Sequence, residues 1–400
     1  MPIDAAAERL ARFLEEQSYV EVYGHHDADG IAAASLICHA LWRRGAGFRL
    51  RVVDRVPALD SEVPTLLCDL GAGLEDLPAH VAVLDHHAPA ARGDGVVLNP
   101  HLVGLDGERV LSAAALAYRV ANRLASCRDL AGLAAAGVLG DGQAFEDENA
   151  AILNEGMTDG VLQVERGVAL PGNSIAEQFE LAIDPYLPGI SGDRGRVREL
   201  LRASLGEEGP ALDLLLSLVV LDTAERAAPG ALETLWGDRV LCLRERPGDA
   251  RTLAAVIEAC GKAGRGGLAA SVCLRAPGAA DDAWSVATAY RQRVIAAVAG
   301  AMPAEEAPFV YRIADGTLAS DVAAALAGPL GGPVLVGAGS DGMVRLSARG
   351  DGTVPLGPLV RQLAAEAGGT GGGHTRRAGG VVPEGAFPQF AAAFAEAVGV

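Results

Sequence analysis

The sequence predicts an α/β protein with an N-terminal parallel sheet, a mainly helical middle region and a smaller C-terminal α/β domain. Short strand-like runs alternate with alanine-rich helical stretches from residue 19 to about 145, and this alternation returns from about residue 305. Strands that alternate with helices are typical of βαβ units and hence of a parallel sheet. A chain of 400 residues is long enough for two or three domains, each with its own core.

The N-terminal region opens with apolar residues at helical spacing in an acidic segment that does not resemble a secretion signal. Runs rich in β-branched and aromatic residues then indicate strands, and alanine-rich stretches indicate helices. We expect strands at Tyr19–Tyr23, Phe48–Val53, Thr65–Cys68 and Val81–Leu84, and helices at Ile31–Arg43, Ser112–Leu124 and Leu130–Leu139. In such a sheet, ligands bind beyond the carboxyl ends of the strands.

The middle of the chain has helical patches around a Pro/Gly-rich loop, Asp184–Asp193. Beyond it, we expect strands at Val310–Ile313, Val334–Val336 and Val344–Ala348, and helices at Ala319–Leu326 and Leu356–Ala367. The string Gly337–Gly342 matches G-x-G-x-x-G, but it runs into a strand-like segment, so we interpret it as a turn between strands. We divide the chain into domains at 1–185, 186–300 and 301–400.

The charge balance limits the ways in which this protein can bind nucleic acid. Acidic residues outnumber basic ones by 51 to 33, and the formal net charge is −18. Binding through an overall positive field needs clustered basic residues, so any contact with nucleic acid must be local. Lys262 is the one lysine, so nearly all basic residues are arginines. We attribute this preference for arginine to genomic base composition or salt adaptation.

Two further features bear on cellular location. The six cysteines are scattered without a C-x-x-C pair, which is typical of reduced core residues and not of a disulfide framework. The longest uncharged run, Val322–Ser340, contains two prolines and several glycines, so it does not form a membrane helix. We expect a cytoplasmic protein without a membrane partner.

Histidines and aspartates gather at the ends of the predicted elements. The string His25–Gly30 (HHDADG) follows the first strand, Asp69 follows the third, Asp85–His87 (DHH) follows the fourth, and Asp141 closes a helix. Taken alone, an aspartate at such a place is commonly a helix cap or a turn residue. Together, we expect these side chains to converge on one crevice of the sheet, where so many carboxylates would need a cation to neutralise them.

The donor set indicates which cation. Imidazole and carboxylate ligands without thiolate favour manganese or another divalent ion. A set this rich can hold two metals about 3.5–4 Å apart, the geometry that activates water and stabilises the leaving oxygen in phosphoester hydrolysis. We predict two Mn²⁺ ions, with Mg²⁺ as the alternative.

In this order, H-x-D-x-D-G, D-L-G, D-H-H and a later G-D resemble the four motifs of the DHH phosphoesterase superfamily. Arg345–Arg349 and Gly371–His374 resemble the DHHA1 substrate-binding domain that accompanies these motifs in RecJ-type nucleases. Asp184–Asp193 and Glu258–Lys262 resemble signatures of the archaeal RecJ-like branch, which includes the nuclease associated with the GINS replication complex. The resemblance covers nearly the whole chain, and it implies a DHH domain, a helical connector and a DHHA1 domain with the active-site cleft between the lobes.

The resemblance also implies a role for each matching residue. The metal ligands would be His25, Asp27, Asp29, Asp69, His86 and Asp141, with Asp69 bridging two ions. His87 would donate to a substrate phosphate, and Asp85 would orient an imidazole. The substrate-binding residues would be Ser347, Arg349, Gly371, Gly372, Gly373 and His374, with the glycines allowing backbone N–H groups close to a phosphate. The chain departs from the branch at Gly24, where serine is common, and at Arg376-Arg377, where small apolar residues are usual.

The implied activity is metal-dependent hydrolysis of phosphodiester bonds, as in a RecJ-like exonuclease on single-stranded DNA or RNA in repair or replication, with GINS as a partner. One alternative is a phosphodiesterase for short oligonucleotides or cyclic dinucleotides, although those relatives have a shorter connector. Another alternative is a non-catalytic replisome scaffold, whose expected signature is loss of metal ligands. All the ligands are present in this chain.

Overall fold

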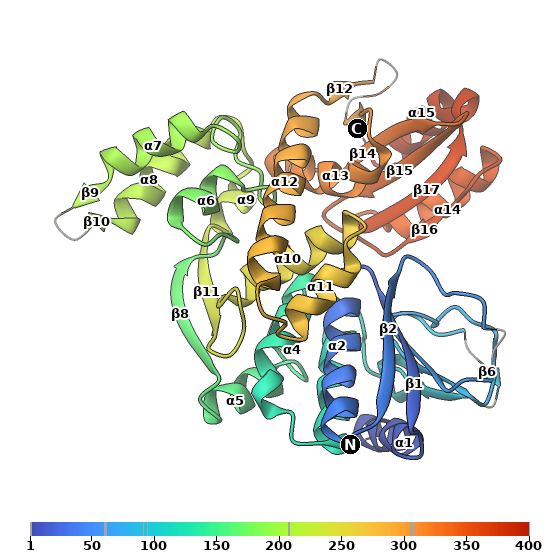
Figure 1. The fold of residues 1–400 in the computed structure, drawn as a ribbon. Coiled ribbons are helices and arrows are strands. Elements are labelled where there is room, and N and C mark those ends of the chain that lie inside the picture. Colours follow the sequence, from blue (N-terminus) through green and yellow to red (C-terminus); the bar gives the residue numbers. More distant parts are fainter. Residues whose placement is uncertain are drawn as a thin grey trace. The chain divides into compact units, whose positions relative to one another are not determined.

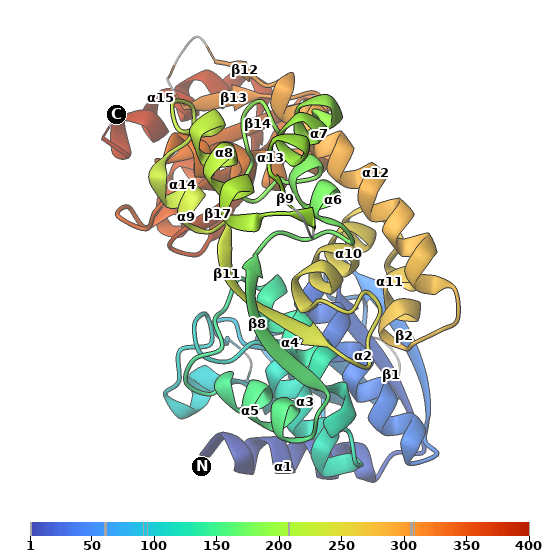
Figure 2. The same ribbon diagram turned by 90° about the vertical axis from the view of Figure 1, so that its left-hand side faces the viewer.

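The computed structural model describes residues 2–59, 62–90, 92–93, 95–206, 209–304, 307 and 309–399 (Figure 1). The chain forms two compact units: unit 1 contains Met1–Gly167 and Asp238–Tyr290, and unit 2 contains Val168–Gly237 and Arg291–Val400. It leaves unit 1 along β8 (Leu162–Val168) and returns along β11 (Trp236–Cys242), two strands that are hydrogen-bonded to each other (Figure 2). The expected boundaries at 185 and 300 stay a prediction.

Unit 1 is built on a five-stranded parallel sheet in the order β2-β1-β3-β5-β7, as the sequence predicts. Its strands are β1 (Tyr19–His25), β2 (Gly47–Val53), β3 (Thr65–Cys68), β5 (Val81–Leu84) and β7 (Val96–Leu98). A separate short pair is formed by β4 (Asp76–Leu77) and β6 (Arg92–Gly93). Because β1, β3 and β5 are neighbours, the three motifs that follow them start side by side.

Helices and loops cover the sheet of unit 1. The helices are α1 (Pro2–Glu15), α2 (Ala28–Arg43), α3 (Ala113–Leu124), α4 (Ala131–Gly140), α5 (Ala150–Thr158), α10 (Ala250–Lys262) and α11 (Gly266–Cys273). The alanine-rich α2 is buried along nearly its whole length, because small side chains let it pack against the sheet and four other helices. Tyr23, Leu67 and Val83 of the sheet belong to one buried hydrophobic cluster with Leu70 and with Leu77 of β4.

Unit 2 combines a helical group with a six-stranded sheet, each with its own hydrophobic cluster. The helical group comprises α6 (Ile175–Glu180), α7 (Arg194–Ala203), α8 (Leu212–Thr223) and α9 (Pro229–Glu233), with a short hairpin of β9 (Leu205–Gly206) and β10 (Gly209–Pro210). The sheet, in the order β12-β13-β14-β15-β17-β16, comprises β12 (Met302–Pro303), β13 (Val310–Arg312), β14 (Val334–Ser340), β15 (Met343–Arg349), β16 (Thr370–Gly373) and β17 (Arg377–Pro383). Four helices complete the inventory: α12 (Ala279–Ala299), which spans both units, α13 (Ala319–Leu330), α14 (Leu356–Glu366) and α15 (Phe387–Ala397).

The G-x-G-x-x-G string comprises the end of β14 and the turn that the sequence predicts. Ser340 and Met343 pair at the end of the antiparallel β14–β15 ladder, so Asp341 and Gly342 alone make the connection. Both have positive φ, 54° and 75°, as expected for a two-residue hairpin turn of the type I′ class. Among the helices of the described ranges, none is long and apolar enough to cross a membrane.

Candidate metal centre

The first motif forms a tight connection between β1 and α2. Asp27 caps the helix, and its Oδ1 accepts a hydrogen bond from the Gly30 N–H at 2.9 Å. A Cβ on Gly30 would lie 2.6 Å from the Cβ of His25, so only glycine fits there. A Cβ on Gly24 would lie 2.8 Å from the Gly30 oxygen, so a serine at this position would require the local backbone to shift.

Asp29 is buried and connects two helices. Its two carboxylate oxygens accept hydrogen bonds from the Ala113 and Ala114 N–H groups, at 2.7 and 2.8 Å, at the N-terminus of α3. This position is favourable for an anion, because the first N–H groups of a helix lack partners within it. The carboxylate is therefore held in place independently of any metal.

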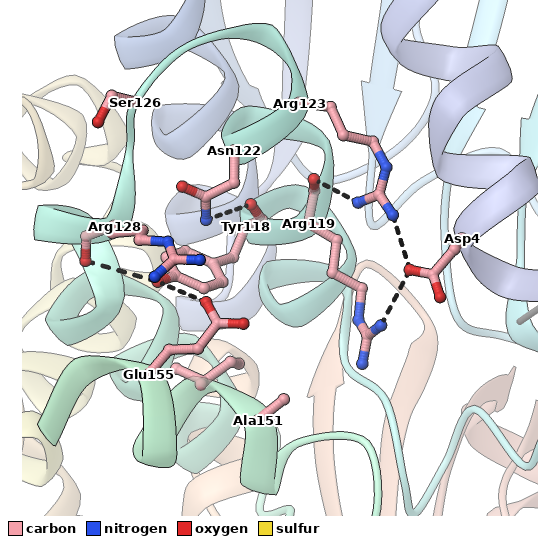
Figure 3. A pocket seen from close by; sticks show the side chains of 10 residues that line it. Asp4, Tyr118, Arg119, Asn122, Arg123, Ser126, Arg128, Ala151 and Glu155 are labelled. Carbon is pink, nitrogen blue, oxygen red and sulfur yellow. Dashed lines mark hydrogen bonds and ion pairs between the residues drawn. The ribbon is translucent and has the colours of Figure 1, made fainter. Parts of the chain in front are cut away.

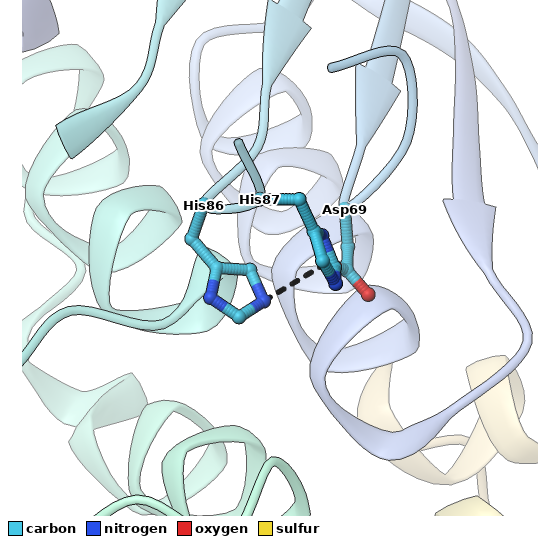
Figure 4. Close-up of side chains that lie close together, drawn as sticks. All are labelled: Asp69, His86 and His87. Carbon is cyan, nitrogen blue, oxygen red and sulfur yellow. Dashed lines mark ion pairs between the residues drawn. The ribbon is translucent and has the colours of Figure 1, made fainter. Parts of the chain in front are cut away.

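Asp69 lies at the centre of the cluster. It follows β3 with a φ of 57°, in the left-handed region that few residues other than glycine adopt, and such strain is concentrated at functional sites. Its Oδ2 is 3.4 Å from His25 Nδ1, and its Oδ1 is 3.3 Å from His86 Nε2 and 3.5 Å from His87 Nδ1. Figure 4 shows the two imidazoles and Asp69 together. Asp69 thus lies between the H-x-D-x-D-G motif, through His25, and the D-H-H motif, through His86 and His87.

The structure brings all six predicted ligands into overlapping groups. Each group offers three ligand atoms that lie within 4.8 Å of one another: His25, Asp27 and Asp69; Asp29, His86 and Asp141; and Asp69, His86 and His87. Because Asp69 and His86 each belong to two of these groups, the three ligand groups lie next to one another. This arrangement offers two neighbouring positions for a cation.

The electrostatics of these groups favour a cation. Burial and the negative charge of Asp69 raise the pKa of Asp29, and burial together with Asp27 raises the pKa of Asp69. Burial lowers the pKa of His25, but Asp27 and Asp69 more than reverse this and raise it to about 11. Among the described residues, the ion pairs of Asp29 and Asp69 are with histidines alone.

One atom points to a metal more directly. Asp69 Oδ1 is buried and accepts no hydrogen bond within the described part of the chain, although two imidazole nitrogens lie near it. An unsatisfied buried carboxylate oxygen is costly, and a divalent cation would satisfy it. The donor set of imidazole and carboxylate therefore fits a divalent ion such as Mn²⁺ or Mg²⁺.

Asp85 lies behind His87 and outside the three ligand groups. Its Oδ1 accepts the His87 backbone N–H at 3.1 Å and lies 2.8 Å from His87 Nδ1, while Oδ2 accepts the Ala72 N–H at 2.9 Å. Burial raises the pKa of Asp85, but the bonds from His87 outweigh it, so the net shift is downward. The carboxylate therefore fixes the orientation of the His87 ring, which is partly exposed.

Helix α10 supports the first motif from a distant part of the sequence. The Ala28 N–H donates a 2.7 Å hydrogen bond to Glu258 Oε2, and Glu258 Oε1 is 2.7 Å from Lys262 Nζ. A Cβ on Gly261 would lie 1.7 Å from the carbonyl oxygen of His26, so the helix contacts the motif through a bare backbone. Glu258–Lys262 is the string that resembles the archaeal branch, but nothing in the sequence predicts this contact.

Two buried amides, Gln143 and Asn149, were missed by the sequence analysis. Gln143 Nε2 donates to Asp141 Oδ2 at 2.8 Å, and Asn149 Nδ2 donates to Gln143 Oε1 at 2.8 Å. The one available signal was the place of Gln143 two residues after Asp141. Nothing in the local pattern distinguishes Asn149 from an ordinary polar residue.

Five of the six predicted substrate-binding residues lie on the two strands of the unit 2 sheet that flank β17. Ser347 and Arg349 are on β15, Gly371–Gly373 form β16, and β17 pairs with both strands. Gly379 of β17 pairs with Ser347 on one side and with Gly372 on the other, so these residues form one row across the sheet. The structure therefore brings Ser347, Arg349 and the three glycines into one sheet, and His374 directly follows β16.

The environments of these residues differ. Arg349 Nη2 donates to Ser320 Oγ at 2.6 Å and Nη1 donates to the Ala348 carbonyl at 2.9 Å, and burial lowers the pKa of Arg349 to about 10. A Cβ on Gly371 would lie 2.9 Å from Val360, so this glycine also allows α14 to pack on β16. Arg376 and Arg377, which stand where the branch usually has small apolar residues, are exposed to solvent.

A pocket of about 370 Å³ opens elsewhere on unit 1 (Figure 3). Its walls include Arg119 and Arg123 of α3, which both point toward Asp4 of α1, at 3.4 and 2.7 Å. Arg119 also pairs with Glu148. Because acidic partners neutralise these arginines, we interpret the pocket as an ion-paired junction that holds α1 on α3.

Comparisons with known proteins agree with this geometry. Residues 307–399 match the DHHA1 domain family. Over 291 residues the chain is 25% identical to an uncharacterised protein of Methanocaldococcus jannaschii, with 66% of each chain covered. Over 252 residues it is 23% identical to the single-stranded-DNA-specific exonuclease RecJ of Bacillus subtilis, covering 56% of this chain and 31% of that RecJ. The matches thus span less than the full length of these relatives.

Solved structures share the fold over nearly the whole chain. RecJ of Thermus thermophilus in complex with Mn²⁺ superposes with a TM-score of 0.60 at 20% identity, covering 98% of this chain and 54% of that RecJ. CDC45 of Entamoeba histolytica superposes with a TM-score of 0.61 at 10% identity, covering 99% of both chains. A parallel sheet with a His/Asp cluster at its carboxyl edge, together with a DHHA1 domain, defines the DHH/DHHA1 class of proteins. Residues 307–399 match the DHHA1 family, and the similarity of the whole chain to RecJ in sequence and fold supports a RecJ-like member of the DHH/DHHA1 superfamily.

Proposed function

We propose that this protein is a divalent-metal-dependent phosphoesterase that hydrolyses phosphodiester bonds, most specifically as a RecJ-like exonuclease on single-stranded DNA or RNA. The observation that carries the proposal is the convergence of His25, Asp27, Asp29, Asp69, His86 and Asp141 into adjacent ligand groups. We propose that these six residues hold two Mn²⁺ ions, with Asp69 shared. Two such ions would activate a water molecule and stabilise the leaving oxygen of a phosphodiester.

The side chains around the ligands have separate roles in this proposal. His87, oriented by Asp85, would donate a hydrogen bond to a phosphate oxygen where negative charge develops. In unit 2, Arg349 and His374, together with Ser347 and the backbone of Gly371–Gly373, would bind a substrate phosphate. Arginine suits this role because its planar guanidinium can bind two phosphate oxygens at once.

The proposal extends to a partner. The chain resembles the branch that includes the nuclease associated with GINS, so we propose the GINS complex as a candidate partner in replication or repair. The complete ligand set argues for catalysis over a purely structural role in a replisome. Catalysis and GINS binding are compatible with each other.

The test is an assay of the purified protein with Mn²⁺ or Mg²⁺ and end-labelled single strands of DNA and RNA. Dinucleotides and cyclic dinucleotides are assayed in parallel, and EDTA serves as the control. Stepwise shortening of the strands would support the exonuclease. Hydrolysis confined to dinucleotides or cyclic dinucleotides would favour the short-substrate alternative, and no hydrolysis of any substrate with either metal would overturn the proposal.

A further inference from the structure

A continuous run of buried amides lies behind two of the candidate ligands. Asn149 Nδ2 donates to Gln143 Oε1 at 2.8 Å, and Gln143 Nε2 donates both to Asp141 Oδ2 at 2.8 Å and to the Gly107 oxygen at 2.9 Å. The same Gly107 oxygen lies 2.8 Å from His86 Nδ1. Gln143 and Asn149 are 5% and 0% exposed, so water does not compete for these bonds. One network thus contacts both His86 and Asp141.

This network determines which nitrogen of His86 is available to a metal. A carbonyl oxygen only accepts hydrogen bonds, so His86 Nδ1 must carry the hydrogen that points to Gly107. His86 Nε2 then faces the carboxylates of Asp69 and Asp29, at 3.3 and 3.8 Å. A Cβ on Gly107 would lie 2.0 Å from the backbone oxygen of His86, so the close approach requires glycine.

The chemistry of the position requires an amide. Gln143 Nε2 donates to two acceptors, the Asp141 carboxylate and the Gly107 carbonyl, while its Oε1 accepts from Asn149. A glutamate here would place a negative charge against Asp141, and an apolar side chain would leave the Gly107 and Asn149 groups without this partner. Glutamine is the residue of this shape that satisfies all three neighbours.

We propose that Gln143 and Asn149 are positioning residues that hold His86 and Asp141 in ligand geometry, and that they thereby set the affinity of one of the two metal positions. Gln143 contacts Asp141 directly and His86 through the Gly107 oxygen, and Asn149 contacts Gln143, so both would act through these two ligands. The inference rests on the proposed function, because it takes the Asp29, His86 and Asp141 group as a metal site. Substitution of such supporting partners typically costs 10–100-fold in metal affinity or activity.

The test is calorimetric titration of the full chain with Mn²⁺, in the wild type and in Gln143→Met, Gln143→Glu and Asn149→Ser. The matched control is Gln178→Met, because Gln178 is a buried glutamine of unit 2 whose Nε2 donates to the Leu170 oxygen at 2.8 Å, away from the ligands. We expect one of two Mn²⁺ positions to weaken 10–100-fold in the Gln143 variants, and the other, formed by His25, Asp27 and Asp69, to change less than twofold. Excess Mn²⁺ should restore kcat, with KM for the nucleic acid unchanged.

The outcomes separate this inference from the proposed function. A wild type that binds two ions and a Gln143→Met variant that binds both equally tightly would overturn the inference alone. If Gln143→Met weakens Mn²⁺ binding equally at both positions and lowers the melting temperature as much as Gln178→Met does, the variant has a general packing defect. That result would also overturn the inference. If Gln143→Met does not fold, Asn149→Ser decides by the same titration. A wild type that binds no Mn²⁺ would overturn the proposed function and this inference with it.

Discussion

At the scale of single residues, Asp69 combines strain, burial and an unsatisfied oxygen. Its left-handed backbone and its buried carboxylate both cost free energy, and the neighbouring Asp27 adds repulsion. A strained, buried and unsatisfied side chain is typical of a functional site, where a loss of stability accompanies activity. Asp69 is therefore the residue at which stability and activity should respond in opposite directions to mutation.

We predict that Asp69→Asn reduces kcat to less than a tenth of the wild-type value, a barrier increase of more than about 1.4 kcal/mol. Asparagine tolerates the left-handed conformation, so the backbone is retained while the charge is removed. Without metal, the variant should melt at a higher temperature than the wild type, because a buried, repelled carboxylate is gone. Assays with Mn²⁺ and melting curves in EDTA check both parts. Activity above a tenth would contradict the shared role of Asp69.

At the scale of elements, the site depends on helices that approach it from distant segments. Helix α10 contacts the first motif through Gly261 and Glu258, and the bond from Ala28 to Glu258 joins residues 230 positions apart. Similarly, the N-terminus of α3 binds the carboxylate of Asp29, 84 positions earlier. The helices therefore act on the ligands and not only on the core.

We predict that Gly261→Ala weakens Mn²⁺ binding and destabilises unit 1 by about 2 kcal/mol or more, because the new methyl group would overlap the His26 carbonyl. The helix must then move away from the loop that carries three candidate ligands. Calorimetry and thermal melting measure the two effects. Gly267→Ala is the control, since a Cβ there meets open space. Normal metal binding in Gly261→Ala would show that α10 does not position the loop.

A second element-scale prediction concerns Asp129, which connects α2 to the segment after α11. Arg43 binds it through two bonds of 2.7 and 2.9 Å, and Arg275 adds a third at 3.0 Å. Burial raises the pKa of Asp129, but these bonds outweigh it and lower the pKa to about 2. A carboxyl group with a depressed folded-state pKa contributes stability above its ordinary value of 3.8 and loses it as pH falls toward 2.

We therefore predict that Asp129→Asn costs about 1 kcal/mol of unfolding free energy at pH 7, a figure reduced for the partial exposure of this side chain. The difference between variant and wild type should shrink as pH falls from about 4 to about 2. Denaturant unfolding at several pH values measures it. A difference independent of pH would mean that packing, and not charge, holds Asp129.

At the scale of the whole molecule, the chain separates its candidate metal ligands from its candidate phosphate-binding residues. All six ligands lie in unit 1, while Ser347, Arg349 and His374 lie in unit 2. Arg349 is anchored within its own unit by Ser320. This separation allows substrate binding and metal binding to be altered independently.

We predict that Arg349→Ala raises KM about 10–100-fold, the cost of losing a hydrogen bond to a charged group, and leaves Mn²⁺ affinity unchanged. Ser320→Ala removes only the anchoring bond, so its effect on KM should be smaller. Steady-state kinetics and metal titration on the same preparations check the prediction. An unchanged KM would assign Arg349 to packing of unit 2, and lost Mn²⁺ would contradict the separation of roles.

The fold class and the candidate ligands followed from the sequence, because short-range patterns carry both. Alternation of strands and helices predicts the parallel sheet, and residues such as Asp69 and His86 lie within two positions of the ends of strands whose order brings them together. The support for these ligands depends instead on contacts between distant segments, such as Ala28 with Glu258 and Gly107 with His86 and Gln143. Hydrogen bonds of this kind have no periodicity and no fixed spacing, so they are defined only when the packed elements place the buried donors and acceptors within reach.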